Sequence, residues 1–154
     1  PELIAAQFVF NEGGGGRLDA DGKRQLLALQ VGEKAAQNFT LVATNPGGHS
    51  SQPVPDNAIY ELADAVKAVQ GYRFPAKFTD TTRAFFTKSA ATMPEPMAGA
   101  VRRLLANPQD VEADAIVSRD KAMNSTLRTS CVTTLLNAGH AENALPQRAT
   151  ANVN

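Results

Sequence analysis

The chain has 154 residues, of which 43% are hydrophobic and 19% charged, and its 15 lysine and arginine residues balance 15 aspartate and glutamate residues. This composition is that of a globular protein able to bury one domain-sized core, and its neutral charge gives no reason to expect a nucleic acid or an anionic membrane as partner. Cys131 is the only cysteine, which excludes an internal disulfide and a zinc site built from cysteines.

The N-terminal stretch is expected to contain short strands and glycine turns. Residues 6–11 are a short apolar run that predicts a buried strand. Residues 13–16 are four glycines expected to break regular structure, and residues 19–22 (Asp-Ala-Asp-Gly) form a turn pattern. Residues 24–34 are a candidate strand because leucine and valine recur along them.

The next segment predicts a strand followed by a helix. Residues 37–45 alternate and contain β-branched side chains, and residues 46–48 (Pro-Gly-Gly) end this predicted strand. Asp56 or Asn57 is expected to cap a helix that ends at Gly71. The apolar face of the strand consists of Phe39, Leu41 and Ala43, and that of the helix of Ile59, Leu62, Ala63, Val66 and Val69.

The second half of the chain predicts further helices before the sequence returns to strands. Residues 79–92 and 95–106 are expected to form two helices separated by Pro94. Asp110 is expected to cap a short helix that ends near residue 122.

The C-terminal part has the composition of strands. Residues 125–137 are rich in residues that favour strands, and Cys131 within them is expected to lie in the core. Residues 139–146, which include His140, predict a loop, and residues 147–154 alternate as a strand.

This order predicts an α+β fold, with an antiparallel sheet that carries helices on one face. It corresponds to part of a ferredoxin-like βαββαβ unit. The chain does not begin with methionine, and its last six residues resemble a strand cut off in its middle, so we expect a piece of a longer protein. No apolar run approaches the ~18 residues of a membrane span, and the N-terminus is not a signal peptide. We therefore expect a soluble protein, cytoplasmic or periplasmic.

Three polar residues stand where functional side chains often occur. Glu12 follows an apolar run and precedes the glycines, so it is either a metal ligand at a strand end or a solvated glutamate beside a turn. His49, in a loop of small residues, either donates a hydrogen bond to a developing oxyanion or is a loop histidine satisfied by Ser50 or Ser51. Asn143 either binds a substrate carboxylate or is an ordinary turn residue.

The sequence contains no complete motif for metal or nucleophile chemistry. It has no His-Glu-x-x-His helix, no Cys-x-x-Cys, no Gly-x-Ser-x-Gly and no phosphate-binding loop. One catalytic zinc ion needs three protein ligands, and spacing alone does not bring Glu12, His49 and His140 together. Any metal site would therefore take most of its ligands from elsewhere.

Three stretches in order resemble a known family. They are residues 10–14 (Phe-Asn-Glu-Gly-Gly), residues 45–53 (Asn-Pro-Gly-Gly-His-Ser-Ser-Gln-Pro) and residues 142–146 (Glu-Asn-Ala-Leu-Pro). They are similar to the co-catalytic zinc peptidases of metallopeptidase family twenty, which include aminoacylase, the glutamate-releasing type of carboxypeptidase and succinyl-diaminopimelate desuccinylase. The resemblance covers the chain except a helical insert at about 75–124.

The resemblance implies a role for each candidate residue. Glu12 would be a ligand of one of two zinc ions per subunit, His49 would reach into the partner subunit's active site and polarise the scissile carbonyl, and Asn143 would hold the substrate carboxylate. The parent enzyme would be a homodimer joined through this lid domain, and it would cleave a peptide or N-acyl amino acid next to a free carboxylate. Residues 1–34 would then belong to the catalytic domain and residues 35–154 to the lid.

The general base and the remaining metal ligands of that family have no match in this sequence. We therefore expect the chain alone to be inactive. A non-catalytic α+β dimerisation or interaction module is the alternative, and a small-ligand-binding domain is a weaker one.

Overall fold

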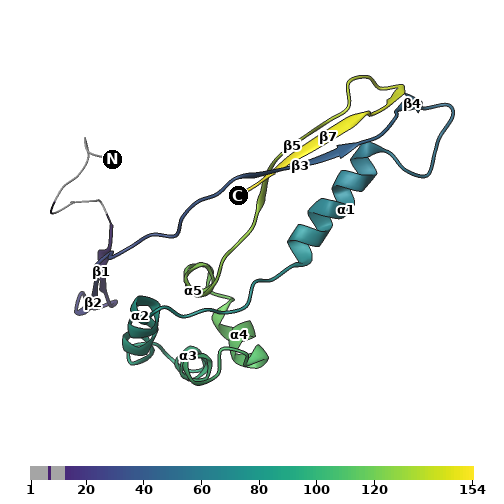
Figure 1. Ribbon diagram of the computed structural model, residues 1–154. Coiled ribbons are helices and arrows are strands. Elements are labelled where there is room, and N and C mark those ends of the chain that lie inside the picture. Colours follow the sequence, from purple (N-terminus) through teal and green to yellow (C-terminus); the bar gives the residue numbers. More distant parts are fainter. Residues whose placement is uncertain (1–6, 8–12) are drawn as a thin grey trace. The chain divides into compact units, whose positions relative to one another are not determined.

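The computed structural model describes residue 7 and residues 13–154 (Figure 1). Both Glu12 and the strand predicted over residues 6–11, apart from residue 7, lie outside the described residues. The chain forms two compact units, Pro1–Lys34 and Ala35–Asn154. The assignment of the first unit to a catalytic domain stays a prediction.

The first unit contains an antiparallel hairpin of β1 (Gly15–Leu18) and β2 (Arg24–Ala28). The carboxylate of Asp19 stabilises the turn between β1 and β2, because it accepts hydrogen bonds from the backbone N–H groups of Asp21 and Lys23 at 3.1 and 2.8 Å. The predicted turn is thus confirmed, and the predicted strand 24–34 forms only in its first half.

The predicted break in regular structure over residues 13–16 is wrong for its second half. Gly15 and Gly16 belong to β1 and pair with residues 28 and 27 of β2. Pairing with a neighbouring strand compensates here for the weak strand preference of glycine.

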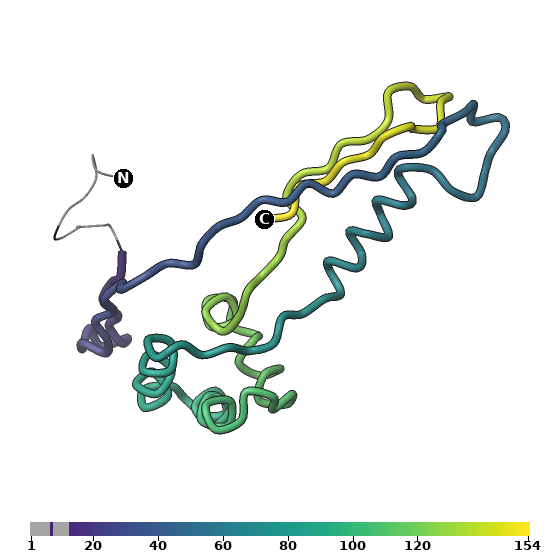
Figure 2. The backbone as a smooth tube through the Cα atoms, viewed as in Figure 1, coloured from purple at the N-terminus to yellow at the C-terminus, as the bar shows by residue number. Residues whose placement is uncertain are grey.

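The second unit contains a three-stranded antiparallel sheet. Its strands are β3 (Phe39–Thr44), β5 (Thr133–Ala138) and β7 (Arg148–Val153), in the order β3-β7-β5. The last strand in the sequence is therefore the central one, and Figure 2 shows the three strands side by side. The strands predicted over residues 37–45 and 147–154 are confirmed, as is the α+β fold with an antiparallel sheet.

Helix α1 (Ala58–Gly71) packs on one face of this sheet (Figure 1). Of the two predicted caps, Asn57 is the N-cap, since its Oδ1 accepts from the N–H groups of Ile59 and Tyr60 at 2.9 and 3.2 Å. The predicted stripe is right at Leu62 and Val66 but wrong at Ile59, which is 40% exposed, and at Ala63, which is also exposed. Ala58 takes the place expected for Ile59, where α1 meets small residues of β7. The shared core consists of Ala58, Leu62, Ala149 and Ala151, with Leu41, Ala43, Val66 and Ala138 partly buried around it.

A helical insert lies in the sequence between α1 and β5. Its helices are α2 (Asp80–Ala90), α3 (Met97–Ala106), α4 (Val111–Val117) and α5 (Lys121–Leu127). The two helices predicted on either side of Pro94 are confirmed as α2 and α3. The insert has a hydrophobic core of its own, separate from the core between α1 and the sheet. The buried core residues are Phe86, Ala90, Ala100, Val101, Leu104, Ala113, Val117 and Leu127.

Two predictions at the end of the insert are wrong. Asp110 does cap α4, but that helix stops at Val117, and a separate helix begins after Asp120, whose side chain accepts from the N–H of Met123 at 2.9 Å. The strand predicted over residues 125–137 begins only at Thr133. Leu127 explains the difference, because its complete burial in the insert core stabilises a helix against the local strand preference.

Cys131 was expected in the core, and the structure places it in the exposed connector before β5. The polypeptide is not in a strand at this position, so the alternation on which that prediction rested does not apply. Among the described residues, none of the helices combines the length and the apolar character that a membrane span requires.

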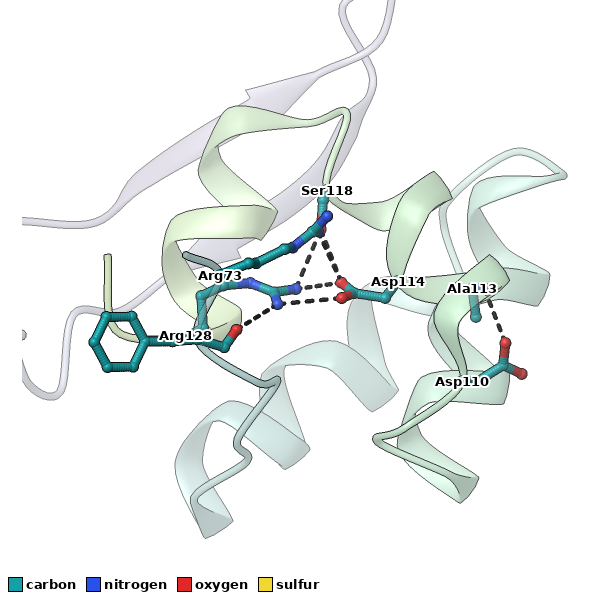
Figure 3. Close-up of polar contacts among 7 residues, drawn as sticks. Arg73, Asp110, Ala113, Asp114, Ser118 and Arg128 are labelled. Carbon is teal, nitrogen blue, oxygen red and sulfur yellow. Dashed lines mark hydrogen bonds and ion pairs between the residues drawn. The ribbon is translucent and has the colours of Figure 1, made fainter. Parts of the chain in front are cut away.

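A buried ion pair ties the two ends of the insert together (Figure 3). Arg128, 6% exposed, donates from Nη1 to the carbonyl oxygen of Phe74 at 2.8 Å and to the Asp114 carboxylate at 3.1 Å. Burial raises the pKa of the Asp114 carboxyl, but hydrogen bonds from Arg128 and Ser118 and the charges of Arg128 and Arg73 outweigh it and leave that pKa below its ordinary value. The incoming and outgoing segments of the insert are thereby held side by side.

Candidate functional site

The structure brings two of the three predicted site residues together. Strand β4 (Gly48–His49) pairs antiparallel with β6 (Ala144–Leu145), and this places His49 opposite Ala144. Asn143 immediately precedes β6, and its amide nitrogen lies 3.5 Å from Nε2 of His49. The two side chains meet although 94 positions separate them in the sequence. Both are exposed, so a ligand has access to them.

Ser51 contacts the other nitrogen of the His49 ring. The Ser51 hydroxyl oxygen lies 2.8 Å from Nδ1, and the Ser51 backbone N–H donates to the same nitrogen at 3.2 Å. Of the two serines suggested by the sequence as partners of the histidine, Ser51 is the one in contact with the ring. Ser50 instead donates its backbone N–H to the carbonyl oxygen of Asn143 at 2.9 Å.

The turn before His49 is held from both sides. The Asn45 side-chain oxygen accepts from the N–H of Gly47 at 3.2 Å, and the Asn45 backbone N–H donates to the carbonyl oxygen of Gln147 at 3.0 Å. Gln147 also donates from Nε2 to the carbonyl oxygen of Pro46 at 3.1 Å. The position of His49 therefore depends on residues from both ends of this unit.

Gly47 is required by the shape of this turn. Its φ is +79°, a left-handed conformation that glycine adopts without strain. A Cβ at this position would lie 2.6 Å from Cγ of Gln147 and 3.1 Å from the carbonyl oxygen of Leu145. Both the backbone angle and the close packing thus favour glycine.

Glu12, the third predicted site residue, lies outside the described residues. His140 lies in the predicted loop. Among residue 7 and residues 13–154, no group of three or more His, Cys, Asp or Glu side chains is arranged to hold a metal ion. The pair of His49 and Asn143 offers hydrogen bonds, and its geometry suits polar recognition of a ligand.

Sequence reasoning missed the residues that position this pair. The Asn-Pro-Gly-Gly turn carries a signal for Asn45, because asparagine side chains commonly bond the backbone two residues on. Gln147 has no local signal, because its contact with residue 46 exists only once β4 and β6 are paired.

Comparison with known proteins identifies relatives. A family model described as Peptidase dimerisation domain matches residues 31–154. The chain is 30% identical over 156 aligned positions to the N-fatty-acyl-amino acid synthase/hydrolase PM20D1 of Homo sapiens, covering 98% of this chain and 30% of that protein. It is 28% identical over 134 positions to the Probable carboxypeptidase S-like 2 of Dictyostelium discoideum, covering 85% of this chain and 25% of that protein. The chain thus spans less than a third of the length of these curated relatives.

Proposed function

Since this chain belongs to the peptidase dimerisation domain family of the M20 hydrolases, we propose that it is the lid part of a dimeric zinc-dependent amide hydrolase. In this proposal the lid supplies His49 and Asn143 to an active site that is otherwise built by the rest of the enzyme. The bond cleaved is an amide or peptide bond next to a free carboxylate. The names of the two relatives, a fatty-acyl-amino acid synthase/hydrolase and a carboxypeptidase-like protein, agree with that substrate class.

The observation that carries the proposal is the contact between His49 and Asn143. Their side-chain nitrogens lie 3.5 Å apart on the paired strands β4 and β6. A peptide C-terminus or an N-acyl amino acid has its scissile carbonyl oxygen and its carboxylate within a few bonds of each other. Two neighbouring hydrogen-bond donors match such a substrate, one for each group.

The chemistry of each side chain suggests its role. An imidazole N–H aimed at a carbonyl oxygen stabilises the negative charge that develops there as the bond is attacked. The amide NH₂ of Asn143 is a neutral donor suited to a carboxylate oxygen. We therefore assign polarisation of the scissile carbonyl to His49 and retention of the carboxylate to Asn143.

We propose that the metal site of the parent enzyme is built mainly by residues other than the described ones. Family membership implies a metal-dependent enzyme, and we propose that zinc is the metal and that Glu12 is one ligand. Residues 13–154 contain no group of three or more His, Cys, Asp or Glu side chains arranged to hold a metal ion, and we propose that this part of the chain contributes contact with the substrate. We expect the isolated chain to show no hydrolysis.

Dimerisation follows from the family, and β5 is the edge we propose for it. A strand at the edge of a sheet presents unpaired backbone groups that can pair with a second chain, and β5 is such an edge in the order β3-β7-β5. Two leucines of β5 are strongly exposed, Leu135 at 69% and Leu136 at 63%. A stable contact needs about 800 Å² from each partner, so the dimer would also use surface beside this strand.

Kinetics of the full-length enzyme test the proposal. His49→Ala should lower kcat by on the order of a hundredfold, the loss seen when one oxyanion donor is removed. Asn143→Ala should mainly raise KM, and more for a substrate with a free carboxylate than for its amide. His140→Ala is the control, because His140 lies outside the site, and it should leave both constants unchanged. A normal kcat in His49→Ala would favour the alternative, a non-catalytic dimerisation module.

A further inference from the structure

The contacts of the His49 ring determine where its proton lies. A backbone N–H can only donate a hydrogen bond, and the N–H of Ser51 points at Nδ1 of His49 at 3.2 Å. Nδ1 must therefore offer its lone pair. In a neutral imidazole with an accepting Nδ1, the proton sits on Nε2.

The Ser51 hydroxyl strengthens this arrangement. Its oxygen lies 2.8 Å from the same Nδ1, and a hydroxyl can rotate to donate. One serine thus places two donors on one ring nitrogen. It fixes both the rotation of the ring and the tautomer, as the second partner of a functional histidine commonly does.

The consequence appears at the opposite side of the ring. The Nε2–H group faces the amide nitrogen of Asn143 at 3.5 Å, and that nitrogen is also a donor. Two donors do not bond each other, so both remain available for the oxygen atoms of a ligand. With the proton on Nδ1 instead, Nε2 would accept from Asn143, and the donor needed for a carbonyl oxygen would be lost.

We propose that Ser51 is a positioning residue, which holds His49 as the Nε2–H tautomer with that N–H directed toward the substrate carbonyl. The significance for catalysis rests on the proposed function, whereas the tautomer itself does not. Ser51 is exposed and lies outside both cores, so its substitution tests the ring without unfolding the chain.

Nuclear magnetic resonance of the ¹⁵N-histidine-labelled chain tests the positioning step. Long-range ¹H–¹⁵N spectra at about pH 8, above the ordinary range of imidazole titration, show which ring nitrogen carries the proton, and a His140→Gln variant assigns the His49 signals. The wild type should show Nε2–H. Ser51→Asp keeps the backbone donor of residue 51 but replaces the hydroxyl at 2.8 Å by a charged acceptor, which should outweigh the longer backbone bond at 3.2 Å and move the proton to Nδ1. Ser50→Ala, the matched control, should change nothing. A wild-type proton on Nδ1, or an unchanged tautomer in Ser51→Asp, would overturn the proposal.

Kinetics of the full-length enzyme provide the second readout. Ser51→Ala should lower kcat about tenfold with little change in KM, the loss expected when a ring bond worth about 1.4 kcal/mol is removed, and Ser51→Thr should restore kcat by restoring the hydroxyl. A normal kcat in Ser51→Ala, or a kcat that Ser51→Thr fails to restore, would count against the positioning role.

Failure of the proposed function and failure of the positioning role of Ser51 would give different results. If the proton moves as predicted but His49→Ala keeps its kcat, the proposed function fails and the positioning stands. If His49→Ala loses activity while Ser51→Asp leaves the proton on Nε2, the positioning fails alone.

Discussion

Gly47 is the position in the His49 loop where the addition of a single methyl group should destabilise the loop most. The left-handed backbone costs alanine about 1 kcal/mol, at the φ of +79° seen for Gly47. The new Cβ would also lie 2.6 Å from Cγ of Gln147 and 3.1 Å from the carbonyl oxygen of Leu145. Overpacking of this kind adds on the order of 1–2 kcal/mol. We therefore expect Gly47→Ala to destabilise the loop by about 2–3 kcal/mol.

Gly139 offers a matched control in the same unit. Its φ is +81°, nearly that of Gly47, but a Cβ there would meet nothing within 4 Å. Gly139→Ala should therefore cost only the backbone term, about 1 kcal/mol. The difference between the two variants isolates the packing of residue 47 against Gln147 and Leu145.

Amide hydrogen exchange is the suitable assay, because the strain opens the β4–β6 pair before it unfolds the whole chain. The probe is the N–H of Ser50, which donates to the carbonyl oxygen of Asn143 at 2.9 Å. Its protection should fall by a larger factor in Gly47→Ala than in Gly139→Ala. Adding Gln147→Ala should recover part of the loss, because it removes the nearer atom. Equal losses in the two alanine variants would refute the packing argument.

Three further predictions concern the ion pair in the insert and the proposed dimer edge. Arg128→Met should lower the free energy of unfolding of the insert by about 3 kcal/mol, because it leaves the Asp114 carboxylate without its buried partner. The control is Arg73→Met, which should lower that free energy by less than about 1 kcal/mol, because the Arg73 side chain is 49% exposed. The pKa of the Asp114 carboxyl is lower in the folded chain than in the unfolded one, so its contribution to stability is complete above the ordinary pKa of an aspartate and is lost as the pH falls through the lower folded value. The loss of stability on acidification, followed by circular dichroism, should therefore be smaller in Asp114→Asn. Leu135→Lys should convert the full-length dimer to monomers in sedimentation experiments, since a lysine on an edge strand opposes pairing. Val42→Lys is its control on β3, the opposite edge strand, and an unchanged dimer in both variants would exclude the β5 edge.

The elements that sequence predicts well are those whose pattern is local. The alternation over residues 37–45 and the caps at Asn57 and Asp110 depend on neighbours a few positions away, and the structure confirms them. The helix at residues 121–127 was missed because its stability comes from Leu127 in the insert core, a contact with distant helices. Local strand preference cannot register such a contact.

The candidate site likewise combines features that the local sequence predicts with features that only contacts between distant residues determine. Its residue types and the family resemblance pointed to His49 and Asn143, but nothing in their spacing placed them 3.5 Å apart. That distance follows from the pairing of Gly48 with Leu145 and of His49 with Ala144, a register visible only in the folded chain. The roles of His49, Asn143 and Glu12 in catalysis stay predictions.

Mixed dimers of the full-length enzyme test most directly whether this lid serves a neighbouring active site. One subunit would carry His49→Ala and the other Glu12→Gln, and we expect each variant to be strongly impaired as a homodimer. If His49 acts in the partner subunit's site, the mixed dimer has one complete site, formed by the intact Glu12 of one subunit and the intact His49 of the other. We predict that activity returns on mixing, and a mixed dimer as inactive as its two parents would contradict the account.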